Sequence, residues 1–335
     1  MSMQAALNVR ALAAALAALV CAGCAGAPAP YMEVARDESL AVIVANRAMS
    51  LETLARAYYG DADRASDLAR FNRMDRVEPG QDVVVPLRAA ATGGISADGY
   101  QTVTILCYHR FTDAATSDNR MIVTAAAFRR QLRYLRDHGY KVVPLSQVVD
   151  FLDRKADLPD KAVVLTIDDG FRSVYSVAYP ILRDFNMPAT LFVYHDFMGG
   201  DLALTRSQLQ DLAASPLFDL QSHSKTHDNL ALQRQGESVQ AYRRRLIAEV
   251  EVPEAALKRL NAGPQYAFSY PYGNGSLDLI DILQERGYRI ATTVQRGGNA
   301  SFSHPYMLRR TMIFGDDDLD TFIRRLESFE RVWRG

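Results

Sequence analysis

Residues 162–170, AVVLTIDDG, form an apolar run rich in β-branched residues that ends in two adjacent carboxylates and a glycine. Apolar runs of this length suit a strand covered on both faces, as in parallel sheets, and Gly170 permits a sharp exit. We therefore expect a buried strand that delivers Asp168 and Asp169 to its C-terminal edge. In α/β barrels, catalytic groups lie at such strand ends. Asp-Asp-Gly is also an ordinary turn sequence, so the downstream motifs must decide.

Two further polar motifs follow short apolar segments, so each is expected at another strand end. FDLQS leads into HSKTH, which contains His223 and His227, and YAF leads into SYPYG at residues 269–273. Two histidines and one carboxylate form the common open site of hydrolytic metal enzymes, with a position left for water or substrate. A lone pair of histidines four residues apart is more often a coincidence on a helix surface.

The order T-x-D-D-G, H-S-x-x-H and x-x-P-Y-G resembles the polysaccharide deacetylases of carbohydrate esterase family 4, which share the NodB-homology domain. The resemblance covers about residues 100–335. It implies an α/β fold, a distorted (β/α) barrel, and one divalent metal held by Asp169, His223 and His227. Zinc is the predicted ion, although imidazole ligands also suit iron, cobalt and nickel.

The same resemblance implies roles around that metal. Asp168 would be the base that takes a proton from the attacking water, and the backbone N–H of Tyr272 would bind the developing oxyanion. Pro271 would fix this turn, and Tyr270 is grouped with it as a substrate contact.

Tyr194 and His195 follow the apolar segment ATLFV and are candidates for the rim of the substrate site. The alternative is that they are ordinary surface side chains.

The general acid is the first departure from the family pattern. Most members carry a histidine in a Leu-x-His motif near the C-terminus, and no histidine follows Asp316 here. Instead, residues 103–110, VTILCYHR, place His109 at the end of the first strand. This resembles the circularly permuted branch typified by the poly-β-1,6-N-acetylglucosamine deacetylases of biofilm matrices. His109 is therefore the predicted acid, and a core histidine is the alternative.

The second departure is Ser269, which stands where most members have the arginine that orients the base. The partner of Asp168 is therefore open. Arg309 or Arg310 is a candidate replacement, and the alternative is that both are solvated.

The N-terminus, residues 1–24, has the pattern of a bacterial lipoprotein signal. Arg10 precedes an Ala/Leu/Val run that is short for a membrane span. Ala22-Gly23-Cys24 resembles a lipobox in which Cys24 is lipidated, although Cys21 stands where that pattern usually has leucine. We expect a lipid anchor to a membrane of the cell envelope, on the periplasmic side and with the outer membrane favoured. The alternative is an ordinary signal peptide with an incidental cysteine.

Residues 25–38 are predicted to be a tether, and residues 39–88 a small α+β domain. Its strand-helix-helix-strand order, with Asn72 and the turn at residues 79–81, resembles a LysM module, which binds N-acetylglucosamine glycans such as peptidoglycan. The usual Gly-Asp-Thr is replaced by Arg-Ala-Met-Ser at residues 47–50, so a purely structural or docking role is the alternative. A linker at residues 89–100 and the deacetylase domain at 101–335 follow.

Composition limits the functional classes. A chain of 335 residues with 48% hydrophobic residues can bury a substantial core, and a net charge of −1 gives no electrostatic footprint for nucleic acid. The leading hypothesis is an envelope-anchored, metal-dependent N-deacetylase of a GlcNAc-containing exopolysaccharide of the poly-β-1,6-GlcNAc type. The alternatives are a peptidoglycan N-deacetylase, a glycan O-acetyl esterase and an inactive glycan-binding envelope lipoprotein.

Overall fold

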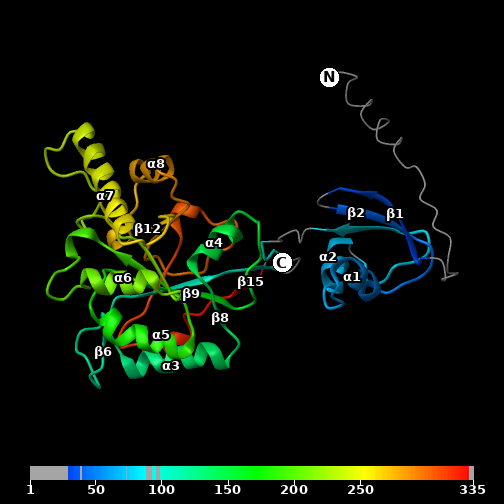
Figure 1. The fold of residues 1–335 in the computed structure, drawn as a ribbon, viewed down its shortest axis with the longest axis horizontal. Helices are drawn as coiled ribbons and strands as arrows, with labels where there is room; N and C mark the ends of the chain where they lie inside the picture. Colours follow the sequence, from blue (N-terminus) through cyan, green and yellow to red (C-terminus); the bar gives the residue numbers. More distant parts are fainter. Residues whose placement is uncertain (1–28, 38–39, 73, 88–92, 96–98, 332–335) are drawn as a thin grey trace. The chain divides into compact units, whose positions relative to one another are not determined.

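The computed structural model describes residues 29–37, 40–72, 74–87, 93–95 and 99–331, and the chain divides into two compact units, Met1–Ala89 and Ala90–Gly335 (Figure 1). The predicted signal peptide, including Cys24, lies outside the described residues. Among the helices of the described residues, none is both long enough and apolar enough to cross a membrane.

The first unit packs two helices against a three-stranded antiparallel sheet of order β1-β2-β3. Its elements are β1 (Tyr31–Arg36), β2 (Leu40–Ala45), α1 (Leu51–Tyr59), α2 (Ala65–Asn72) and β3 (Asp82–Pro86). Ser50 caps α1 by accepting the Thr53 N–H, and Gly60 ends the helix in the left-handed region at φ 71°. The Asn72 side chain both donates to and accepts from the Val84 backbone at 2.8 Å, which joins α2 to β3.

Strand β1 differs from the sequence-based expectation, which made residues 25–38 a tether. Tyr31–Arg36 instead pairs antiparallel with β2. The strand was hard to predict because every residue after Tyr31 is exposed, so it shows none of the alternation of apolar and polar residues that marks a half-buried strand.

The second unit is built on a parallel sheet of order β13-β12-β11-β10-β9-β5-β14, with β8 beside β9. In chain order these strands are β5 (Thr104–Tyr108), β8 (Lys141–Val142), β9 (Ala162–Ile167), β10 (Ala189–Val193), β11 (Phe218–Ser222), β12 (Ala267–Ser269), β13 (Ile290–Thr292) and β14 (Thr311–Met312). All six residues of β9 are buried, as expected for a strand covered on both faces.

The two ends of this sheet are joined by the segment that leads into β14. Leu308 forms a parallel bridge with Thr292, donates its N–H to the Ala291 carbonyl at 3.0 Å and accepts the Thr293 N–H at 2.8 Å. Three residues later, Thr311 pairs with Leu106 of β5. The segment therefore closes the curled sheet, which confirms the predicted distorted (β/α) barrel.

Helices surround the sheet (Figure 1). They are α3 (Ala125–Asp137), α4 (Leu145–Leu152), the π-helical turn η1 (Val174–Ala178) with α5 (Tyr179–Phe185), α6 (Arg206–Ala214), α7 (Val239–Arg259), α8 (Leu277–Glu285) and α9 (Leu319–Ile323). Thr124 caps α3, and the apolar face of this helix, Phe128, Leu132 and Leu135, is buried.

Two short strand pairings complete the unit. After the five-residue α9 the chain forms β15 (Phe329–Arg331), antiparallel to β4 (Gly99–Gln101), which overlaps the end of the expected linker. Strand β6 (Arg110–Thr112) pairs with β7 (Ile122–Thr124) just after the first barrel strand.

Candidate active site

Strand β9 ends at Ile167 and delivers two carboxylates to the edge of the barrel. Asp168 donates its backbone N–H to the Tyr108 carbonyl at 2.9 Å, which keeps it in line with neighbouring β5. The chain then turns at once, because Asp169 and Gly170 lie in the left-handed region at φ 74° and 89°. A Cβ on Gly170 would stand 2.9 Å from a methyl carbon of Val193, so only glycine fits this turn without a shift.

Asp168 is paired with Arg310, and both side chains are buried. The Arg310 Nη1 and Nη2 atoms each donate to one Asp168 oxygen at 2.7 Å, a bidentate geometry that fixes the plane of the carboxylate. Arg310 also donates to the Thr293 carbonyl at 2.9 Å and to the Ser269 hydroxyl at 2.8 Å. The candidate replacement for the missing arginine is thus Arg310, and the alternative of a solvated pair is wrong for this residue.

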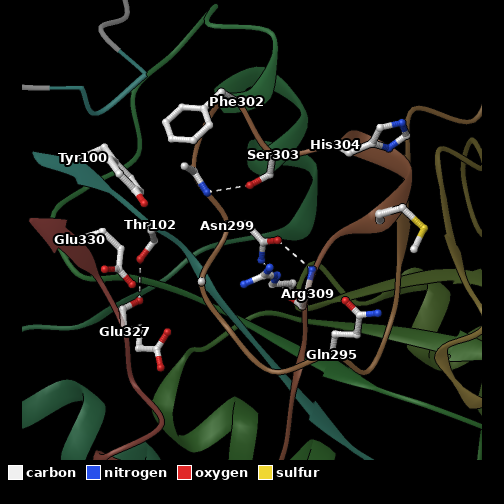
Figure 2. Close-up of a pocket in the computed structure, with 13 residues that line it drawn as sticks. Tyr100, Thr102, Gln295, Asn299, Phe302, Ser303, His304, Arg309, Glu327 and Glu330 are labelled. Atoms are coloured by element: carbon white, nitrogen blue, oxygen red, sulfur yellow. Dashed lines mark hydrogen bonds between the residues drawn. The ribbon is translucent and has the colours of Figure 1, made fainter. Parts of the chain in front are cut away.

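Arg309 has a different environment, although it is the adjacent residue. Its exposed side chain lines a cavity of about 420 Å³, where Figure 2 shows it beside Asn299 and Gln295. The residues that line this cavity are Tyr100, Thr102, Gln295, Gly298, Asn299, Ala300, Phe302, Ser303, His304, Met307, Arg309, Glu327 and Glu330. None of them is a predicted metal ligand, base or acid, so this cavity is separate from the carboxylate site.

The two aspartates have opposite electrostatic environments. Burial opposes ionisation of Asp168, but the Arg310 guanidinium outweighs it and holds the pKa of that carboxyl well below its usual range. Burial and the neighbouring Asp168 charge raise the pKa of Asp169 to about 7. Asp169 Oδ1 is buried and has no hydrogen-bond partner among the described residues. Such an orphaned carboxylate oxygen fits a cation ligand.

The two predicted histidine ligands converge on this oxygen. His223 Nε2 lies 3.6 Å and His227 Nε2 lies 3.4 Å from Asp169 Oδ1, and the three ligand atoms lie within 4.8 Å of one another. The Nδ1–H of His223 donates to the Ser269 carbonyl at 2.7 Å, which leaves the Nε2 lone pair for a metal. Burial lowers the pKa of His223 to about 4, so the ring is neutral at pH 7, as a metal ligand must be.

His109, the predicted acid, lies near Asp168, the predicted base. One of its ring nitrogens is within 4.8 Å of both an Asp168 oxygen and the Cys107 sulfur. Its Nδ1 is buried without a hydrogen-bond partner in the described part of the chain. A core histidine satisfied by hydrogen bonds would not leave this atom unpaired.

The predicted substrate contacts divide into two groups. Tyr272 is 61% exposed, with its ring 4.9 Å from that of His227, and the Tyr194 ring lies 5.0 Å from the same histidine. The prediction that the Tyr270 side chain contacts substrate is wrong, because it is fully buried and its hydroxyl donates to the Tyr306 carbonyl at 3.0 Å. Pro271 is also buried, which suits a residue that fixes the turn.

His195 faces its neighbours in the loop rather than His223 or His227. Its Nδ1 lies 2.7 Å from Asp196 Oδ1, and it lines a separate cavity with Met198, Arg206 and Arg259.

Comparison with known proteins agrees with this arrangement. The family model for polysaccharide deacetylases matches residues 155–291, which include both aspartates and both histidines of the site. His109 and Arg310 lie outside that range: His109 directly follows β5, which pairs with β9, and Arg310 directly precedes β14, which pairs with the other side of β5.

Relatives are similar over a longer range. The poly-β-1,6-N-acetyl-D-glucosamine N-deacetylase of Staphylococcus aureus is 23% identical over 212 residues, which cover 62% of this chain and 72% of that protein. The Escherichia coli protein of the same name is 27% identical over 256 residues, or 66% of this chain but only 38% of that protein. The solved structure of IcaB from Ammonifex degensii matches with a TM-score of 0.57 and 26% identity, covering 68% of this chain and 96% of that one.

The barrel, the carboxylate-histidine group at its edge and these similarities lead to one conclusion: the second unit of this chain is a polysaccharide deacetylase domain of the NodB type.

Proposed function

We propose that the second unit removes N-acetyl groups from a GlcNAc-containing polysaccharide of the poly-β-1,6-linked type. The observation that carries the proposal is the convergence of Asp169, His223 and His227 directly beside the Arg310-paired Asp168. The names of the staphylococcal and E. coli relatives support the substrate. The place of His109 on the first barrel strand supports the same branch of the family.

Asp169, His223 and His227 would hold the divalent metal, for which we propose zinc because imidazole and carboxylate are its common ligands. When bound, such an ion polarises a carbonyl group and strongly lowers the pKa of water. This acidity is needed because Asp168, whose own pKa is held low by Arg310, is a weak base.

The protein's own groups then account for the proton transfers. Asp168 accepts the proton of the water that attacks the acetyl carbon, and the Arg310 pair keeps its carboxylate ionised and fixed in orientation. His109 donates a proton to the sugar nitrogen as the carbon–nitrogen bond breaks. The products are acetate and a free amine on the sugar. We further propose that the Tyr272 backbone N–H stabilises the oxyanion, and that the Tyr272 and Tyr194 rings contact the sugar beside His227.

Acetate release tests the proposed substrate. The purified chain should be assayed side by side on poly-β-1,6-GlcNAc, chitooligosaccharides and peptidoglycan, with O-acetylated xylan as an ester control. We expect release to be highest on the first polymer. Preferential release from peptidoglycan or from the ester would replace the proposed substrate, and no release from any of the four by metal-loaded protein would favour an inactive binding protein.

We also propose that Cys24 carries a lipid that anchors the protein to the envelope, and that the first unit docks onto peptidoglycan. The lipobox pattern and the LysM-like order of elements support this. Replacing Cys24 by serine should shift the protein from the membrane to the soluble fraction, because the acyl chain supplies the anchor. An unmodified mature N-terminus at another residue, found by mass spectrometry, would contradict the lipid assignment.

A further inference from the structure

Glu249 is a buried carboxylate on α7 that bonds to the loop between the two histidine ligands. Its side chain is 2% exposed. One oxygen, Oε2, accepts the backbone N–H groups of Lys225 and Thr226, each at 2.9 Å. The other, Oε1, accepts the Thr226 hydroxyl at 2.7 Å. All three donors therefore come from residues that lie between His223 and His227.

In the described part of the chain, no cationic side chain pairs with this carboxylate. Among the ion pairs formed by the described residues, none includes Glu249. A buried carboxylate is stable only when its oxygens are well satisfied, and hydrogen bonds from backbone N–H groups to an ionised oxygen are among the stronger ones. Glu249 and the loop thus depend on each other: the loop satisfies the carboxylate, and the carboxylate holds two backbone N–H groups of the loop.

The loop needs such support because its backbone is unfavourable for the residues it contains. Ser224 and His227 both lie in the left-handed region, at φ 72° and 62°, which side chains other than glycine rarely adopt. Such conformations persist where the surroundings hold them. The Ser224 hydroxyl accepts the His227 N–H at 3.0 Å, and the Ser224 carbonyl accepts the His195 N–H at 3.1 Å.

These contacts divide the support of the loop between two sides. Its carbonyls bond to the 3₁₀ turn η2 (His195–Phe197), since Asp196 donates its N–H to the Lys225 carbonyl at 2.9 Å. The N–H groups of Lys225 and Thr226 bond to Glu249. The loop backbone is therefore held from two sides, and it carries the His227 ring whose Nε2 lies 3.4 Å from Asp169 Oδ1.

We propose that Glu249 is a positioning residue that preorganises the His223–His227 loop for metal binding. The proposal rests on the metal site of the proposed function, but it makes a separate statement: without this carboxylate, the ligands remain and the loop that presents them is no longer fixed. Groups that orient metal ligands typically contribute about 10- to 100-fold in metal affinity.

Two substitutions and a matched control test this. Glu249→Ala removes both oxygens and with them all three hydrogen bonds. Glu249→Gln keeps one oxygen that can accept both backbone N–H groups, and its side-chain NH₂ group can donate to the Thr226 hydroxyl. Glu251→Ala changes an exposed carboxylate on the same helix that pairs with Arg286. Zinc and cobalt dissociation constants should be measured on the purified full chain by chelator competition, together with melting temperature.

We expect Glu249→Ala to weaken metal binding about 10- to 100-fold, Glu249→Gln to restore most of the affinity, and Glu251→Ala to leave it unchanged. Hydrogen exchange in the metal-free chain should show faster exchange of the Lys225 and Thr226 amides in Glu249→Ala. If wild-type protein binds metal and Glu249→Ala binds it equally well, the positioning role is wrong and the proposed function stands.

If the wild type binds no metal, the proposed function fails, and amide exchange then tests the preorganised loop by itself. Should Glu249→Ala not fold, Thr226→Val, which removes only the hydroxyl donor, takes its place. An intermediate loss of metal affinity in that variant supports the positioning role, and unchanged affinity contradicts it.

Discussion

Arg310 and Asp168 form a bidentate ion pair that is closed to solvent, although 142 positions separate them in the chain. The arginine enters from the residue before β14, on one side of β5, and the aspartate follows β9 on the other side. Ser269 completes the group, because its small side chain accepts a bond from Arg310 and donates to Asp168 at 3.3 Å. The position of the orienting arginine is thus taken by a residue from another strand.

Replacing Arg310 by methionine should both destabilise the protein and abolish most of its activity. Removing one partner of a buried ion pair typically costs about 3–5 kcal/mol, because the other charge remains buried alone. Denaturant unfolding and acetate release on the same preparation measure the two effects. Arg309→Met is the matched control, since that side chain is exposed, and a loss of equal size in both variants would contradict the assignment.

The ion pair also predicts a pH dependence of stability. Because the folded-state pKa of Asp168 is depressed, its stabilising contribution is complete above the unfolded pKa of about 3.9 and is lost as the pH falls toward the folded value. In Arg310→Met, burial acts on Asp168 without the opposing guanidinium, so protonation relieves that variant first. The difference in unfolding free energy between wild type and Arg310→Met should therefore be largest at neutral pH and shrink on acidification. A difference that instead grew on acidification would show that the pair does not stabilise the fold.

Removing the metal should abolish activity, and each histidine ligand should be required for binding. His223→Ala and His227→Ala should both lose the ion in elemental analysis. Only His223→Ala should also lower stability appreciably, by about 1–3 kcal/mol, because it leaves the buried Ser269 carbonyl without its donor. His304→Ala is a control with an exposed imidazole. Full activity after exhaustive chelation would overturn the metal assignment.

Asp168 and His109 should have separable roles. Asp168→Asn should retain metal and lose activity. General acid–base groups typically contribute roughly 10²- to 10⁴-fold to the rate, and we expect a loss near the upper limit because the base also generates the nucleophile. His109→Ala should retain metal, lower kcat more than KM and change the alkaline limb of the pH profile. A lower melting temperature with near-normal turnover per folded molecule would instead make His109 a core residue.

The two tyrosines of the SYPYG turn should respond in opposite ways. Tyr270→Phe leaves the Tyr306 carbonyl without its donor and should cost about 0.5–1.5 kcal/mol of stability with kcat unchanged. Tyr272→Ala should leave stability nearly unchanged and raise KM, since the ring is exposed beside His227. Steady-state kinetics and thermal unfolding of both variants check this, and unchanged KM in Tyr272→Ala would remove it from the substrate site.

The sequence predicts the centre of the site well because each group follows a buried strand. A continuous apolar run marks β9, and the carboxyl ends of parallel strands meet at one edge, so Asp168, Asp169, His223 and His227 had to converge. The same reasoning placed His109 after β5. These residues lie within a few positions of their strands, where local pattern is informative.

The partner of Asp168 could not be chosen from the sequence, and Glu249 gave no signal at all. Strand β14 has two residues, too few to show which of Arg309 and Arg310 faces inward. Glu249 lies on a charged helix, where an acidic residue usually faces water. Tyr270 was misassigned because the sequence does not separate it from Tyr272 of the same turn, which is exposed, whereas the Tyr270 ring packs in a core cluster of the barrel.

The closing segment at residues 308–312 sets the order in which the site is completed. The metal-ligand group is complete once residue 227 has been synthesised, whereas Arg310 follows more than eighty positions later and pairs with a carboxylate next to the first barrel strand. Such distant pairings form late, because long loops must close first. We therefore expect a chain emerging from the ribosome to assemble its metal ligands first, and the counter-charge of Asp168 to arrive only when the barrel closes.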